Sequence, residues 1–346
     1  MNIFIIGNGF DLAHGLKTRY SDFLLDAEIN NIWFEHLKYK YHKNGNTTWI
    51  DFETEIYNVL KSINWKTNHI PSMKHYPATI RSILEYKKIF DEDYKKLDDN
   101  QKNYIKFNGD FKYGDLIFEL IENIDLINFL YNELIELSVT FKEYCIKIDK
   151  IKIEFDKIVL EPFYNFRKLN LKYADNINIL NFNYTNTFER LYKNDFNSIN
   201  SVHIHGNCKE EHIIFGTQSF NRKINENGDI IGKDKDFPSD LNIFEKYTLR
   251  HKFRTIDKFQ KLLREMYYMS TAEKAKSKIY IIGHSLNKTD HGILKSVFDN
   301  SGQCDINVYY HNEEAQEQYI RNMRDIIGED AVTRRVCFTN TSEIMA

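Results

Sequence analysis

The chain has 346 residues, of which 42% are hydrophobic, and its formal net charge is −3. A chain of this size can bury a large core, and the absence of a dominant run of like charge argues against constitutive binding to DNA or RNA. No apolar stretch approaches the roughly 20 residues that span a bilayer, and the four cysteines have no regular spacing. We therefore expect a cytoplasmic protein with reduced thiols and no membrane partner.

A short apolar run at residues 3–6 predicts a first strand that is buried on both faces. The strand ends at Gly7, and Gly9 and Gly15 follow before an amphipathic run that begins at Tyr20. Glycines at this place can bring backbone N–H groups against a phosphate, because they have no Cβ to block the approach. Their spacing matches neither the dinucleotide fingerprint nor the phosphate loop. Nucleotide binding and a simple tight turn therefore both stay open.

Helices are predicted next, at residues 18–41 and 49–60. In the second helix the apolar residues recur three and four positions apart, which is typical of a helix with one buried face. Asp51, Glu53 and Glu55 lie near its N-terminal end, where carboxylates interact favourably with the helix dipole. Glu53 is interpreted either as a residue of the helix cap or as a functional carboxylate.

The segment 63–172 is rich in charged residues, Tyr, Leu and Ile, in a helical rather than an alternating pattern. The pattern is clearest at residues 114–148, where Leu and Ile recur three and four apart over many turns. We expect a large helical insertion here, which divides a nucleotide-binding core into residues 1–62 and 173–346. Core packing is the simplest interpretation of its apolar stripes, and a lid or a partner surface are the alternatives.

Strands and helices alternate through the second half of the chain. The predicted strands are 177–180, 202–207, 212–218, 278–282, 306–310 and 331–338. The predicted helices are one that carries Phe188, Leu191 and Tyr192, and then 242–275, 290–299 and 313–327. Such alternation indicates an α/β fold with a mostly parallel, Rossmann-like sheet and helices on both of its faces.

Four predicted strands end in glycines and polar residues, at 7–11, 183–186, 205–207 and 283–290. Because ligands bind beyond the carboxyl ends of parallel strands, we expect these segments to converge on one cleft. A neutral imidazole such as that of His205 can act there as a general base, and an Asn amide can position a hydroxyl or a water. Asp11 and Asp290 can accept hydrogen bonds from ribose hydroxyls. Taken singly, His205 is also explained as a turn residue, and Asp290 and the polar residues at 183–186 are also explained as helix caps.

Five motifs, in this order, closely resemble the AbiH family of bacterial abortive-infection proteins, which defend against bacteriophage: IIGNGFDLAHGLKTRYSDF, WIDFE, LNFNYTNTFE, HIHGN and IIGHSLNKTD. More distantly, their order resembles that of sirtuin-like domains in bacterial defence systems, where such strand ends surround NAD. This resemblance implies NAD as substrate or ligand, and cleavage of the bond between nicotinamide and ribose. It puts Asn183 and His205 at the catalytic positions. The residues expected to contact the cofactor are Gly7, Asn8, Gly9, Phe10, Asp11, Tyr184, Thr185, Gly206, Gly283, Ser285 and Asp290.

Two alternatives stay open beside hydrolysis of NAD. One is a nucleotide sensor that binds without turnover and acts through a partner. The other is metal-assisted hydrolysis of a phosphoester, for which the candidate ligands are Asp11, His14, Glu53, His205 and Asp290. These residues have no compact ligand spacing, so no metal is expected. The sequence leaves open whether the chain forms a homo-oligomer or responds to a phage-derived trigger.

Overall fold

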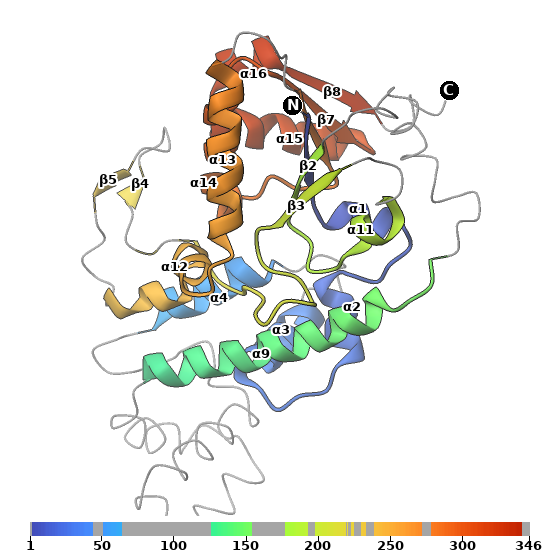
Figure 1. Cartoon of the computed structure of the whole chain (residues 1–346). Helices are drawn as coiled ribbons and strands as arrows, with labels where there is room; N and C mark the ends of the chain where they lie inside the picture. The colour runs from blue at the N-terminus through green and yellow to red at the C-terminus, as the bar shows by residue number, and fades with distance from the viewer. Residues whose placement is uncertain are drawn as a thin grey trace, which may run out of the picture.

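The computed structural model describes residues 2–43, 51–63, 126–153, 177–192, 198–218, 220, 223–224, 230–232, 239–271 and 278–340. Its centre is a six-stranded sheet with the order β3-β2-β1-β6-β7-β8, in which every neighbouring pair is parallel (Figure 1). The strands are β1 (Asn2–Ile6), β2 (Ile177–Asn181), β3 (Ile199–His203), β6 (Lys278–Ile282), β7 (Asp305–Tyr310) and β8 (Val336–Asn340). A separate antiparallel pair is formed by β4 (Lys223–Ile224) and β5 (Ile230–Gly232). The predicted Rossmann-like α/β fold is confirmed.

Helices cover both faces of the sheet, as the unbroken apolar run of β1 requires. Ile3 and Ile5 belong to a core with α13 (Ile256–Thr271), α14 (His291–Asn300) and α15 (Glu313–Ile327). Phe4 and Ile6 point to the other face and belong to a second core with residues of α1 (Asn8–Ala13) and α11 (Thr187–Tyr192). Successive residues of a strand point to opposite faces, so residues 3–6 of β1 are buried between the two layers.

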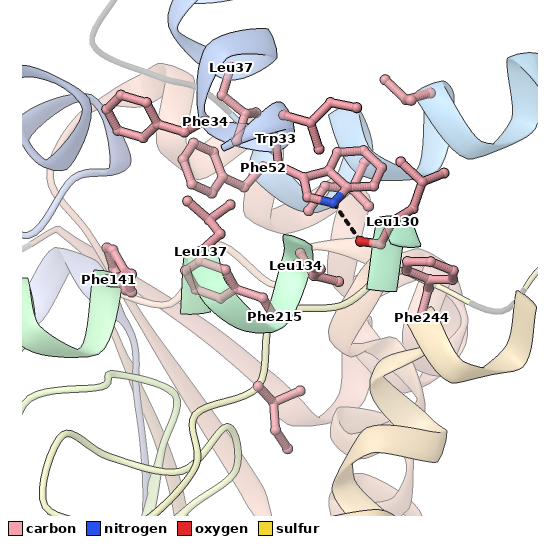
Figure 2. Packing of buried hydrophobic residues seen from close by; sticks show 14 of the residues in the cluster. Trp33, Phe34, Leu37, Phe52, Leu130, Leu134, Leu137, Phe141, Phe215 and Phe244 are labelled. Carbon is pink, nitrogen blue, oxygen red and sulfur yellow. Dashed lines mark hydrogen bonds between the residues drawn. The ribbon is translucent and has the colours of Figure 1, made fainter. Parts of the chain in front are cut away.

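A third core lies within a layer of helices beneath the carboxyl end of β1, where the strand runs into α1 (Figure 1). The helices of this layer are α2 (Tyr20–Asp26), α3 (Ile32–Lys43), α4 (Phe52–Ser62), α9 (Leu126–Asp149) and α12 (Lys246–Lys252). Figure 2 shows its packing, in which the indole Nε1 of Trp33 donates a hydrogen bond of 2.9 Å to the carbonyl of Leu130. This bond joins α3 to α9 and satisfies the one polar group of a fully buried side chain.

The predicted helix 18–41 is two helices, α2 and α3, because Asn31 begins the second one. The Oδ1 atom of Asn31 accepts hydrogen bonds from the backbone N–H groups of Trp33 and Phe34, as an N-cap residue does. The predicted helix 49–60 is confirmed from Phe52 onward as α4, with Asp51 as its N-cap, and residues 49 and 50 lie outside the described residues. The predicted helix 114–148 is confirmed from Leu126 onward, and residues 114–125 lie outside the described residues.

The second half of the chain departs from the predictions at three internal segments and at the last strand. Residues 212–218 are not a strand, since they form only an isolated bridge from Thr217 to Glu245. The strand predicted at 202–207 is β3, which ends at His203 because the chain turns at Gly206 with a φ of +72°. The helix predicted at 242–275 is interrupted between α12 and α13, where Arg254 has a φ of +58°.

The last strand begins later than predicted, because a short helix, α16 (Glu329–Arg335), precedes β8. Two acidic residues occupy its first turn, and Asp330 forms an ion pair with Arg334 one turn later. Both features favour a helix over a strand here. The strand predicted at 331–338 is therefore wrong for residues 331–335, which belong to α16.

The predicted division into a core and an insertion at 63–172 stays a prediction, because residues 64–125 and 154–176 lie outside the described residues. Within the described part, α9 shares one apolar core with α2, α3 and α4. The described helices include none that is both long and apolar enough to cross a bilayer.

Candidate functional site

A cavity of about 890 Å³ lies at the carboxyl ends of the strands, between the sheet and the layer of helices. Its volume is within the range of pockets that bind small molecules. The sheet order changes direction here, since the strand that follows β1 in the chain pairs on one side of it and β6 pairs on the other. Ligands of open α/β sheets bind at such a switch point.

Most of the predicted site residues line this cavity. They are Gly7, Asn8, Gly9, Asp11, Asn183, Tyr184, Thr185, His205, Gly283, Ser285 and Asp290. Two predicted residues are not part of the lining. Phe10 is buried in the core, with its ring 4.5 Å from that of His14 and 6.0 Å from that of Phe188. Gly206 makes a turn in which a Cβ would come within 2.4 Å of the carbonyl oxygen of His212.

The glycines at the ends of β1 and β6 are required by the contact between their two turns. A Cβ on Gly7 would lie 2.5 Å from the Cα of His284, and one on Gly283 would lie 2.3 Å from the amide nitrogen of Phe10. The amide of Gly7 donates to Ile282, and that of Gly9 donates to Gly283. The tight-turn interpretation thus accounts for these glycines, and neither of these N–H groups is left for a phosphate.

The first polar group of the cavity is built around Asp11, which lies on α1 directly after β1. One carboxylate oxygen accepts a bond of 2.5 Å from the hydroxyl of Thr185, and the other accepts one of 3.3 Å from the amide of Asn183. Burial raises the pKa of Asp11 to about 6, although hydrogen bonds from Thr185 and Thr187 oppose the increase. A carboxylate with a perturbed pKa in a cavity is typical of a functional site.

The second polar group is a cluster of buried charges around Asp290 and Lys246. The Nζ atom of Lys246 lies 2.5 Å from Glu53 Oε1 and 3.2 Å from Asp290 Oδ1. The same Asp290 oxygen is 3.0 Å from Arg250 Nη2 and 3.2 Å from His205 Nε2. These contacts connect α4, α12 and the segments that follow β3 and β6. Lys246, Arg250 and Asp290 are each less than a tenth exposed.

Burial and the neighbouring charges shift the pKa values of both carboxylates and both imidazoles of this cluster. Burial and the nearby Lys246 ammonium lower the pKa of His205 to about 3, so its ring is neutral at physiological pH. Burial alone would raise the pKa of Asp290, but Lys246 and His205 hold it well below its ordinary value. Burial raises the pKa of Glu53, and Lys246 opposes this increase. Burial also lowers the pKa of His284 to about 4.

The ring of His205 has one nitrogen without a partner. Its Nε2 lies 3.2 Å from Asp290 Oδ1, which can only accept, and 3.4 Å from Lys246 Nζ, which can only donate. The contact with Asp290 is the shorter one, and on that basis we assign the ring proton to Nε2 and the lone pair to Nδ1. Within the described part of the chain this buried Nδ1 has no hydrogen-bond partner, and the Nε of Arg250 has none either. Buried polar atoms are nearly always paired, and the Nδ1 of this cavity residue is available to accept a hydrogen bond from a bound molecule.

Sequence reasoning overlooked Lys246, Arg250 and His284 in this site. Lys246 and Arg250 are four positions apart, so they lie on one side of α12, but their segment was interpreted only as a helix. His284 directly follows Gly283 inside a quoted motif. Glu53 was weighed as a functional carboxylate, and its contact with Lys246 places it in the cluster.

The described residues include no group of three or more His, Cys, Asp or Glu side chains that could hold a metal ion. Of the five candidate ligands, His14 faces the core. Its Nδ1 donates 2.7 Å to the carbonyl of Phe10, and its Nε2 accepts a bond of 2.9 Å from the hydroxyl of Tyr192. His14 thus has a structural role at the C-terminal end of α1.

Comparison with known proteins bears on the motifs that surround the cavity. No curated protein matches the chain. A family model described as "Bacteriophage abortive infection AbiH" matches residues 3–310, which is most of the chain and includes every strand of the sheet except β8. The match supports a role in defence against bacteriophage. The chain therefore belongs to the bacteriophage abortive infection AbiH family.

Proposed function

We propose that this abortive-infection protein binds NAD in the cavity at the end of the sheet and hydrolyses it to nicotinamide and ADP-ribose. The observation that carries the proposal is the convergence of the polar segments after β1, β2, β3 and β6 on one cavity that contains Asn183 and His205. The substrate itself comes from the distant resemblance to sirtuin-like domains. A cavity at a topological switch point is where an α/β protein would hold such a ligand.

In this reaction the bond between C1′ of the ribose and the nicotinamide nitrogen breaks, and nicotinamide leaves with the bonding electrons. A water oxygen bonds to C1′, and one water proton is released to solvent. Positive charge develops on the ribose before the water is deprotonated, so orientation of the water matters more than a strong base. The neutral His205 would accept a hydrogen bond from the water or a ribose hydroxyl through Nδ1, and Asn183 would position the ribose.

The buried charges give independent support for a catalytic cavity. A buried cluster such as that of Glu53, Lys246 and Asp290 adds little net stability, because desolvation offsets the attraction between the charges. Its position on the cavity wall suggests a different reason for its presence. Its Asp290 carboxylate contacts Nε2 of His205 and so fixes the ring that we propose meets the substrate.

The test measures release of nicotinamide from NAD by the purified full chain and by two variants, each with a single histidine replaced by alanine. His205→Ala should lose the activity and keep the wild-type Tm within a few degrees. His251→Ala is the matched control, because His251 is an exposed histidine on the neighbouring α12 and should retain the activity. Equal activity of wild type and His205→Ala would overturn the proposed role of His205, and no activity in any of the three would overturn the hydrolase.

A second candidate, binding without turnover, is favoured by one observation. Asn183 and Asp290 already use their side chains on protein partners, and Gly7 and Gly9 use their amides in the same way. A nucleotide sensor would show an NAD-dependent increase in Tm without release of nicotinamide. The same preparation of protein distinguishes the two functions.

A further inference from the structure

We propose that Asp11 is a positioning residue that fixes the side-chain amide of Asn183, so that the amide oxygen is left for the substrate. This inference deepens the function proposed above and rests on it for the identity of the substrate. The orientation of the amide, in contrast, is a property of the protein alone and can be measured without a substrate.

The backbone of Asn183 is held on both sides. Its N–H donates 2.9 Å to the side-chain oxygen of Asn181, the last residue of β2. Its carbonyl accepts a bond of 2.9 Å from Nδ1 of His203, at the end of β3. The residue is thereby fixed between two neighbouring strands. Only the side-chain amide can still adopt two orientations, in which its nitrogen and oxygen exchange places.

The carboxylate of Asp11 determines the orientation of this amide. Its Oδ1 lies 3.3 Å from Nδ2 of Asn183, and an ionised carboxylate can only accept a hydrogen bond. The amide nitrogen must therefore face Asp11, and the oxygen must face away from it. None of the described residues donates a hydrogen bond to this Asn183 oxygen, which belongs to a residue of the cavity wall.

A chain of hydroxyls keeps Asp11 an acceptor. The hydroxyl of Thr187 donates 3.0 Å to that of Thr185, which then directs its own proton to Oδ2 of Asp11. Both carboxylate oxygens thus accept from neutral donors. Substrate hydroxyls or a water would then meet an oxygen acceptor on Asn183, and a reversed amide would present an N–H donor in its place.

Protonation of Asp11 would reverse this arrangement, because a carboxylic acid can donate to the Asn183 oxygen. Burial brings the pKa of Asp11 to about 6, so the change falls just below neutral pH. The groups that act on it from the facing elements are Thr185 and Thr187 beside β2 and α11, Asp149 on α9, and His203 on β3. Of the charged groups, Asp149 raises this pKa and His203 lowers it.

The first test is the Asp11→Asn substitution in the full chain. The introduced amide can still accept from Thr185 through its oxygen, but its nitrogen now donates, so Asn183 must reverse to keep a hydrogen bond. We expect a Tm no lower than that of the wild type and a kcat for nicotinamide release that falls at least roughly tenfold, with KM within about twofold. The control is Asp26→Asn, an exposed aspartate on α2 that should leave kcat unchanged. An unchanged kcat in Asp11→Asn would overturn the proposal.

The second test needs no activity. In a chain labelled with ¹⁵N-asparagine, the side-chain NH₂ signal of Asn183 is assigned by its loss in Asn183→Asp. In the wild type this signal should shift with a midpoint near pH 6, and it should not shift in Asp11→Asn. A wild-type Asn183 NH₂ signal whose chemical shift does not change between pH 5 and pH 8 would overturn the positioning role. Failure of nicotinamide release with a positive NMR result overturns the proposed function and leaves the positioning of Asn183 intact.

Discussion

The cavity holds two buried aspartates whose surroundings move their pKa values in opposite directions. Asp11 is 1% exposed and Asp290 is 7% exposed, so water is almost equally excluded from both. The neighbours of Asp11 are hydroxyls and an amide, and its pKa rises to about 6 because burial prevails. The neighbours of Asp290 include Lys246 and Arg250, which outweigh burial and hold its pKa well below the ordinary value. Partner charge, rather than depth, separates the two residues.

The two aspartates should therefore contribute to stability with opposite signs. An ionised Asp11 at neutral pH is a desolvated charge without a cationic partner among the described salt bridges. Its ionisation therefore lowers the free energy of unfolding. Asp290 is the common partner of cations and imidazoles from two other segments, so its removal leaves buried positive charge unpaired. The following predictions test this contrast.

The largest expected effect is that of Asp290→Asn. Removal of one partner from a buried ionic cluster leaves Lys246 and Arg250 without their shared carboxylate. We expect the free energy of unfolding in urea at pH 7 to fall by about 3–5 kcal/mol. Asp299→Asn, an exposed aspartate on α14, is the control and should change it by less than about 0.5 kcal/mol. A loss of similar size in both variants would mean that the cluster is not an energetic unit.

Asp11→Asn should have the opposite effect at pH 7.5. The pKa of Asp11 is raised from 3.8 to about 6, and the cost of its ionisation disappears with the charge. Two pKa units correspond to roughly 3 kcal/mol, so we expect the variant to be more stable by about 1–3 kcal/mol. Urea unfolding of the wild type and the variant in one buffer measures this difference. A variant less stable than the wild type would show that Asp11 has a structural role.

The advantage of Asp11→Asn should vanish in acid. Because the folded-state pKa is the higher one, the stability linked to this proton is fully present below pH 3.8 and is lost as the pH rises through about 6. The difference in Tm between variant and wild type should therefore be smallest at pH 4 and reach its full size by pH 7. A difference that is constant with pH would assign the effect to packing instead of charge.

The smallest expected effect concerns His203, which holds the backbone of Asn183. Burial opposes protonation of His203, but the carboxylate of Glu189, 3.0 Å away, raises its pKa overall. This contribution is present below the ordinary pKa of 6.5 and is lost as the pH rises through the raised value. Glu189→Gln should therefore cost about 1 kcal/mol at pH 6 and less at pH 9. Equal losses at the two pH values would contradict a protonated His203.

The parts of the fold that follow local patterns were predictable from the sequence. The buried runs at β1, β2 and β6 end in glycine or polar residues, and these ends do converge on one cavity. The break at Asn31 and the helix before β8 depend on a single cap and on one ion pair, which hydrophobic periodicity does not register. The exact set of cavity residues had no such signal, because Glu53, Lys246 and Asp290 meet only through the tertiary fold.

The glycines after the first strand are the clearest case of a sequence feature that allows two structural interpretations. Gly7 and Gly9 suggested either a phosphate-binding loop or a tight turn, and their spacing alone could not decide between the two. The contact of one turn with the backbone of the other explains both residues without a ligand. Such backbone contacts between distant segments leave no trace in sequence spacing.

The proposed mechanism of defence is hydrolysis of NAD in this cavity. Its most direct test measures cellular NAD and phage yield together, in infected cultures that express the wild type, His205→Ala or His251→Ala. The account predicts that NAD and phage yield both fall with the wild type and with His251→Ala, and that neither falls with His205→Ala. Protection by His205→Ala with undiminished NAD would contradict the account.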